Sequence, residues 1–119
     1  MANDLPDVAI IISSYNYGEY VISAIDSAMS QDYKGKIKVI VVDDGSPDDS
    51  WEKICNITNE KETINLEEPY YKGPLEVRQK DHLYAYRINN SGASTARNVG
   101  IYQCLNWAQV FGILDADDE

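Results

Sequence analysis

The fold of this chain is indicated most clearly by Lys38-Val39-Ile40-Val41-Val42-Asp43-Asp44-Gly45-Ser46-Pro47. Its first half is apolar and mostly β-branched, which predicts a buried strand, and two carboxylates and a Gly-Ser-Pro turn follow directly. Buried strands of this kind are typical of parallel sheets in α/β proteins, whose ligands bind beyond the carboxyl ends of the strands. The stretch therefore predicts an α/β fold with a polar site just after its strand.

Two more apolar runs end in the same way. Residues 8–12 lead into Ser13-Ser14-Tyr15-Asn16, and residues 110–114 lead into Asp115-Ala116-Asp117-Asp118. Apolar residues recur at helical spacing between these runs, which predicts helices over residues 18–31, near 51–57 and over 94–107. Alternating strands and helices predict a three-layer, Rossmann-like arrangement, with a mainly parallel sheet of about four strands flanked by helices.

The segment 58–81 gives the weakest structural signal. It is polar and contains two turns with proline, and only residues 75–78 indicate a short edge strand. The loose alternation of residues 82–89 then predicts a further main strand.

Size and charge limit the classes of function. The 119 residues indicate one domain, and the formal net charge of -10 argues against nucleic acid or an anionic membrane surface as the main partner. No apolar run approaches the roughly 18 residues that span a bilayer, and two cysteines without a secretion signal indicate a cytoplasmic protein with reduced thiols.

The carboxylates near the end of the chain suggest a metal site. Asp115, Asp117 and Asp118 would repel one another, and a divalent cation would remove that penalty. A set of oxygen ligands without His or Cys favours Mg²⁺ or Mn²⁺ over zinc. A solvated acidic tail is the alternative interpretation.

The loop before the last predicted helix contains small residues and then Arg97, and reads Asn89-Asn90-Ser91-Gly92-Ala93-Ser94-Thr95-Ala96-Arg97-Asn98-Val99-Gly100. A helix N-terminus beside an arginine can hold an anion, although a glycine turn with a surface arginine explains the same residues.

Taken in order, these segments resemble the N-terminal, donor-binding half of a family 2 glycosyltransferase with the GT-A fold. The resemblance covers nearly the whole chain and rests on four pieces: Ile10-Ile11-Ile12-Ser13-Ser14-Tyr15-Asn16, Val41-Val42-Asp43-Asp44-Gly45-Ser46, the loop from Asn90 to Gly100, and Leu114-Asp115-Ala116-Asp117-Asp118. The chain departs from the family pattern in the segment 58–81, which is longer than the connection usual in the family.

The resemblance implies a role for each matching residue. Ser13 and Tyr15 would frame the uracil ring of a UDP-sugar, and Asp44 would accept the hydrogen bond of the base N3–H. Arg97 would lie near the nucleotide. Asp115-Ala116-Asp117 matches the DXD motif, which holds the ribose and the metal on the diphosphate, and Asp118 extends it.

The resemblance also implies partners and a location. The expected partners are a nucleotide-sugar donor and a carbohydrate or lipid-linked acceptor, in surface polysaccharide or glycolipid synthesis, at the inner face of the membrane in the full-length protein. Because family members continue beyond the acidic motif with the acceptor site and the catalytic base, we expect this chain to bind donor, to transfer sugar poorly and to self-associate through its last strand.

Two other functions fit parts of this pattern. A response-regulator receiver domain also holds magnesium with three acidic residues, but its acidic pair follows the first strand, and a lysine follows its phosphorylated aspartate. Here Asp43 and Asp44 follow the second strand. A non-catalytic nucleotide-binding or interaction fragment is the other alternative.

Overall fold

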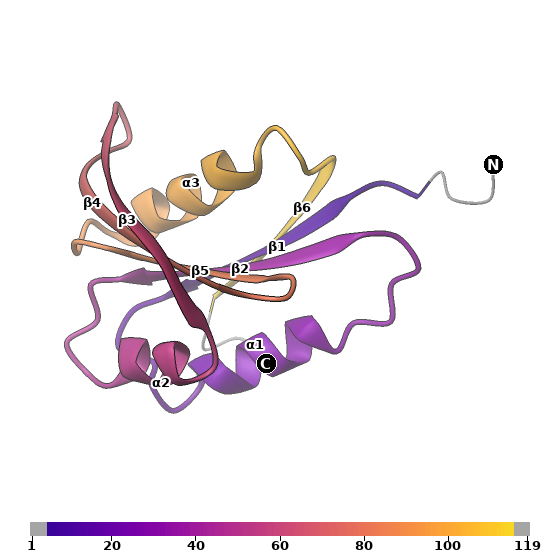
Figure 1. Cartoon of the computed structure of the whole chain (residues 1–119), viewed down its shortest axis with the longest axis horizontal. Coiled ribbons are helices and arrows are strands. Elements are labelled where there is room, and N and C mark those ends of the chain that lie inside the picture. Colours follow the sequence, from indigo (N-terminus) through magenta and orange to yellow (C-terminus); the bar gives the residue numbers. More distant parts are fainter. Residues whose placement is uncertain (1–4, 116–119) are drawn as a thin grey trace.

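The computed structural model describes residues 5–115, which form one six-stranded sheet with helices on both of its faces (Figure 1). In chain order the elements are β1 (Val8–Ser14), α1 (Val21–Met29), β2 (Ile37–Asp44), α2 (Ser50–Asn56), β3 (Asn59–Glu68), β4 (Tyr71–Lys80), β5 (Leu83–Ile88), α3 (Ala93–Cys104) and β6 (Val110–Asp115).

The centre of the sheet is parallel. The strands follow the order β3-β4-β5-β2-β1-β6, and β5, β2, β1 and β6 all run in the same direction. The carboxyl ends of β1, β2 and β6 therefore meet at one edge, with Ser14 opposite Asp43 and Ser13 opposite Asp115 in the backbone register. This confirms the predicted α/β fold with a mainly parallel sheet.

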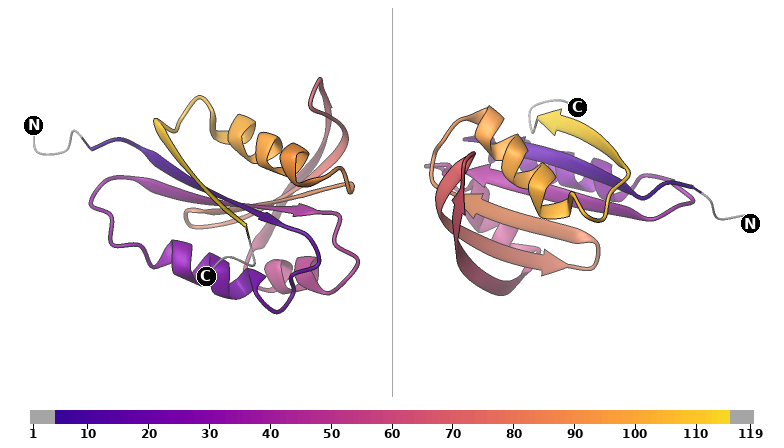
Figure 2. Two further views of the ribbon diagram at one scale, coloured as in Figure 1. Left: turned by 180° about the vertical axis from the view of Figure 1, so that it is seen from behind. Right: turned by 90° about the horizontal axis from the view of Figure 1, so that it is seen from above.

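The two faces of the sheet carry separate cores. Helix α3 covers one face, and α1 and α2 cover the other, as Figures 1 and 2 show. Residues of β2 alternate between these cores: Ile40 and Val42 pack on the α3 side, whereas Val39 and Val41 pack on the α1 side. This alternation decides where each polar residue at the strand ends is placed.

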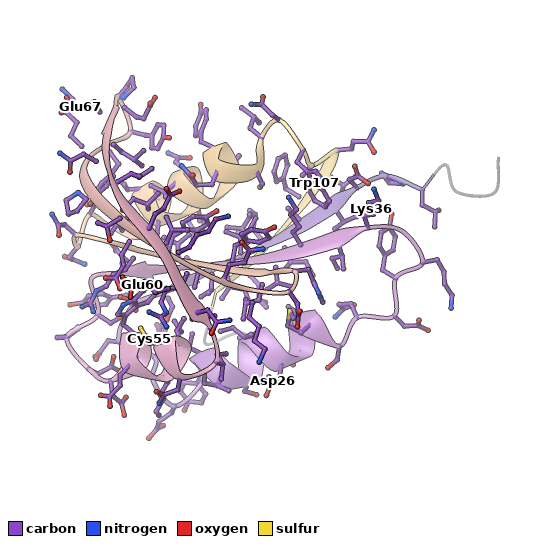
Figure 3. All side chains as sticks on the ribbon, viewed as in Figure 1. Asp26, Lys36, Cys55, Glu60, Glu67 and Trp107 are labelled. Atoms are coloured by element: carbon purple, nitrogen blue, oxygen red, sulfur yellow. The ribbon has the colours of Figure 1, made fainter. Side chains whose placement is uncertain are left out.

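The sheet has more strands than the sequence predicts. The segment 58–81 forms the hairpin of β3 and β4, whose two strands are antiparallel, and β4 also pairs antiparallel with β5. Only residues 75–78 of this segment were expected to be extended. The sequence does not predict β3 because the strand has no buried face: nine of its ten residues are exposed. Glu60 and Glu67 lie along its length (Figure 3). Without alternating burial, a strand leaves no period-2 pattern in the sequence.

The opposite edge of the sheet is apolar. β6 is an edge strand within the described residues, and its Val110 and Ile113 are each 47% exposed. Self-association through this surface stays a prediction. Among residues 5–115, no helix is both long enough and apolar enough to cross a membrane.

Gly100 allows α3 to lie directly on the sheet. A Cβ at this position would come within 2.7 Å of Ile11 Cγ2 and 3.2 Å of Val42 Cγ2. We expect Gly100→Val to lower the free energy of unfolding by about 2 kcal/mol, because overpacking a filled core typically costs about 1–3 kcal/mol. Urea unfolding would measure the loss, with Asn98→Val on the exposed face of the same helix as the control. Equal stability of the two variants would show that the helix moves away without cost.

Candidate functional site

A cleft of about 330 Å³ opens at the carboxyl ends of β1 and β2, on the face that α3 covers. It is lined by Ser13, Ser14, Tyr15, Tyr17, Asp44, Asn90, Gly92, Ala93 and Ala96. Three predicted site residues, Ser13, Tyr15 and Asp44, are therefore together in one cleft. It lies at the place where open α/β sheets bind their ligands.

Strand alternation separates the acidic pair. Asp44 lies on the α3 side with Val42 and reaches the cleft, whereas Asp43 lies on the opposite face. Asp43 is fully buried, and its Oδ2 accepts a hydrogen bond from the Ser46 N–H at 3.0 Å and lies 3.6 Å from Arg87 Nε. Burial raises the pKa of Asp43, while the contacts from Ser46 and Arg87 partly offset that rise. Asp43 thus holds the turn after β2 and does not line the cleft.

Asp44 holds the loop that precedes α3. The Ser91 N–H donates to its Oδ1 at 2.7 Å, and the Gly92 N–H donates to its Oδ2 at 2.9 Å. The Asn90 side-chain amide donates to the Asp44 backbone carbonyl at 3.0 Å. These bonds fix the plane of a carboxylate that is only 3% exposed. Because a carboxylate oxygen can accept two hydrogen bonds, Oδ1 keeps room for a donor from a ligand.

The loop after β2 contacts the loop between β5 and α3 at Gly45. Gly45 has a φ of 66°, in the left-handed region, and a Cβ there would lie 2.6 Å from the backbone nitrogen of Asn90. Only glycine meets both conditions without a shift of the backbone. The loops after β2 and β5 are therefore packed against each other without space for a side chain.

The loop after β1 is tied to the loop after β2. The Asn16 N–H donates to Ser46 Oγ at 2.9 Å, and the Gly18 N–H donates to Asp48 Oδ2 at 3.0 Å. Asp48 is exposed, and the slight desolvation of its carboxyl raises its pKa, but hydrogen bonds from Ser50 and Gly18 lower the pKa below its ordinary value. These bonds hold the segment that carries Tyr15 and Tyr17, and Tyr15 remains 43% exposed at the cleft.

The remaining predicted residues are placed less completely. Arg97 is half-buried on α3 next to Ala96, which lines the cleft, but Arg97 is not itself among the lining residues of the described chain. Its role near a nucleotide stays a prediction. The backbone of Asp115 lies opposite that of Ser13, beside the cleft.

The predicted metal ligands Asp117 and Asp118 lie outside the described residues. Within the described part of the chain, no group of three or more His, Cys, Asp or Glu side chains could hold a metal ion. The metal site stays a prediction, and its oxygen-only ligands would suit Mg²⁺ or Mn²⁺.

Sequence reasoning missed several lining residues. The predicted site residues do not include six that line the cleft, namely Ser14, Tyr17, Asn90, Gly92, Ala93 and Ala96. Four of them belong to the small-residue loop and the first turn of α3, so the resemblance pointed to the segment but not to these positions. Their place depends on the Asp44 contacts, which no local pattern reveals.

Comparison with known proteins identifies similar sequences. The profile of the family described as "Glycosyl transferase family 2" matches residues 9–119. The UDP-Glc:alpha-D-GlcNAc-diphosphoundecaprenol beta-1,3-glucosyltransferase WfaP of Escherichia coli is 38% identical over 71 residues, which cover 60% of this chain and 28% of that protein. The minor teichoic acid biosynthesis protein GgaA of Bacillus subtilis (strain 168) is 33% identical over 112 residues, which cover 92% of this chain and 21% of that protein.

A third relative aligns over most of this chain. An uncharacterized glycosyltransferase of Haemophilus influenzae is 30% identical over 115 residues, which cover 97% of this chain and 38% of that protein. The chain thus spans well under half the length of these three relatives.

Proposed function

Because the chain belongs to glycosyl transferase family 2, we propose that its cleft binds the nucleotide of a nucleotide-sugar donor, and specifically a UDP-sugar. In this proposal the bound sugar is transferred to a carbohydrate or lipid-linked acceptor. Tyr15 packs on the uracil ring, Ser13 lies beside it, and Asp44 reads the edge of the base.

The observation that carries the proposal is the fixed carboxylate of Asp44. It lines the cleft, it is almost wholly buried, and two backbone N–H groups hold its plane. Uracil presents a donor, N3–H, between two carbonyl groups, whereas adenine presents an acceptor at the corresponding edge. The Asp44 carboxylate is already held in place before the base binds, so accepting the uracil N3–H costs no further side-chain entropy. This fixed acceptor therefore favours uracil over adenine.

The diphosphate is proposed to lie between α3 and the end of β6. Ala93 and Ala96 in the first turn of α3 line the cleft, so the positive end of this helix faces it. Asp115, Asp117 and Asp118 would hold a Mn²⁺ or Mg²⁺ ion there, with Arg97 nearby. The metal would neutralise charge on the leaving diphosphate.

The acceptor is proposed from the relatives. The name of the E. coli protein states a diphosphoundecaprenol-linked acceptor, and that of the B. subtilis protein states teichoic acid synthesis. We place the present chain in the synthesis of surface polysaccharide or glycolipid, in the cytoplasm or at the inner face of the membrane. The formal charge of -10 disfavours binding through anionic lipid headgroups alone.

Competition between nucleotides tests the proposal. With Mn²⁺ present, UDP should bind about 10- to 100-fold more tightly than ADP, because a hydrogen bond to a charged group is worth about 1.5–3 kcal/mol. GDP should rank between them, since its N1–H is a donor but its ring system is larger. Displacement of a fluorescent UDP analogue would give the ranking. Equal competition by ADP would remove the base-reading role of Asp44 and with it the uridine assignment.

A further inference from the structure

The β3–β4 hairpin contacts the loop that Asp44 holds. The hairpin extends the sheet beyond β5, and Tyr71, Leu75 and Val77 of β4 pack in the core beneath α3. Figure 2 shows the turn of the hairpin rising on the same side of the sheet as α3. The hairpin is therefore placed beside the cleft-forming loop, although none of its residues lines the cleft.

The hydroxyl of Tyr71 makes the connection. It accepts a hydrogen bond from the Asn89 N–H at 3.0 Å and donates to the Pro74 carbonyl oxygen at 2.7 Å. The Tyr71 side chain is only 5% exposed, so its hydroxyl is held in place on both sides. Gly73 leaves room for this arrangement, because a Cβ at that position would lie 2.9 Å from the Tyr71 hydroxyl oxygen.

The loop is held at both ends. Tyr71 holds it at Asn89, and Asp44 holds it at Ser91 and Gly92. Between these points the Ser91 hydroxyl donates to the Asn89 carbonyl oxygen at 2.8 Å. A shift of Asn89 would therefore be passed within two residues to the N–H groups that orient the Asp44 carboxylate.

A second contact joins the hairpin to α3. Tyr70 stacks on Tyr102 with the ring centroids 4.5 Å apart and an angle of 8° between the planes. Stacked aromatic pairs add stabilisation beyond the area they bury. The hairpin thus contacts both the loop and the helix that follows it.

We propose that the β3–β4 hairpin positions the loop between β5 and α3 for nucleotide binding. Tyr71 is the positioning residue: through its hydroxyl it holds the loop whose N–H groups orient the Asp44 carboxylate. The inference rests on the proposed function, and it assigns a role to the segment that departs from the family pattern. Asp44 touches the base in this account, and Tyr71 acts only through Asn89 and the loop.

Tyr71→Phe tests the proposal, because it keeps the ring in the core and removes only the hydroxyl. With Mn²⁺ present, its affinity for UDP should fall about 3- to 10-fold, and its preference for UDP over ADP should narrow. Tyr33→Phe is the matched control, since its hydroxyl donates to the Pro6 carbonyl oxygen far from the cleft. The control should leave both affinity and preference unchanged. Equal UDP affinity and preference in Tyr71→Phe and wild type would overturn the proposal.

Amide hydrogen exchange on the ligand-free chain provides a second readout. In wild type the Asn89, Ser91 and Gly92 amides should be protected, and Tyr71→Phe should speed exchange at all three while the β2 amides stay protected. Unprotected Asn89 in wild type, or unchanged exchange at Ser91 and Gly92 in the variant, would overturn the proposal even if Tyr71→Phe weakened UDP binding by destabilising the fold. If wild type binds no UDP, the proposed function fails, whereas faster exchange in the variant would still support the anchor at Asn89.

Discussion

In the presence of Mn²⁺, Asp44→Ala is expected to weaken UDP binding about 10- to 100-fold, and Asp44→Asn is expected to weaken it less. Alanine removes the proposed acceptor for the base N3–H and leaves the Ser91 and Gly92 N–H groups without their partner. Asparagine keeps one carbonyl oxygen, but its amide nitrogen would face one of the two N–H donors. Isothermal titration calorimetry of the three proteins would give the order.

The comparison needs a control for charge and for stability. Asp32→Ala removes the same charge from the exposed loop between α1 and β2, at the opposite end of the sheet from the cleft. It should bind UDP like wild type. Thermal unfolding would establish a temperature at which every variant is folded, since Asp44→Ala also releases the loop. UDP affinity of Asp44→Ala equal to that of Asp32→Ala would contradict a role of Asp44 in base recognition.

The parallel part of the sheet could be predicted because its strands are continuous apolar runs, each followed by polar or acidic residues. β1 and β2 are buried in the centre of the sheet, and β6 keeps the same apolar pattern at the edge. The helices between them show one apolar face, which the cores confirm through Val21, Ile25 and Val99. Burial imposes these patterns directly, so a single sequence is enough to find them.

The hairpin could not be predicted, since its stability comes from partners rather than from its own pattern. Leu75 and Val77 of β4 are buried, but β3 gains only edge pairing and exposes nearly every side chain. The strand predicted at residues 75–78 therefore includes the buried Leu75 and Val77 of β4, but it misses the buried Tyr71 and all of β3. Polar edge strands are common and carry no local signal of this kind.

The sequence predicts which types of residue form the site, but not the hydrogen bonds and ion pairs that join them. Period-2 alternation would separate Asp43 from Asp44, yet only the fold places Arg87 beside Asp43 and the Ser91 N–H on Asp44. The bonds that join the loops link residues far apart in the chain, such as Asn16 to Ser46 and Tyr71 to Asn89. Such pairs depend on strand order, which local composition does not encode.

Removal of divalent metal is expected to weaken UDP binding at least about tenfold, because two unit charges 4 Å apart repel by about 4 kcal/mol at an effective dielectric near 20. The diphosphate would meet Asp115, Asp117 and Asp118 in a chain of net charge -10, and a cation is needed to reverse that repulsion. Calorimetry in Mn²⁺ and in EDTA would measure the change. Asp117→Ala should lose more of the Mn²⁺ effect than Asp118→Ala, since we propose Asp117 as the second carboxylate of a DXD motif.

Uridine separates the metal effect from the effect of the base. It presents the same N3–H to Asp44 but carries no phosphate, so its weaker binding should be the same in Mn²⁺ and in EDTA. Loss of uridine binding in EDTA would mean that the metal supports the fold of the cleft rather than the diphosphate. If instead UDP binds equally well in Mn²⁺ and in EDTA, Asp115, Asp117 and Asp118 do not hold a metal for the donor. Positive charge from Arg97 and the N-terminus of α3 would then have to balance the diphosphate alone.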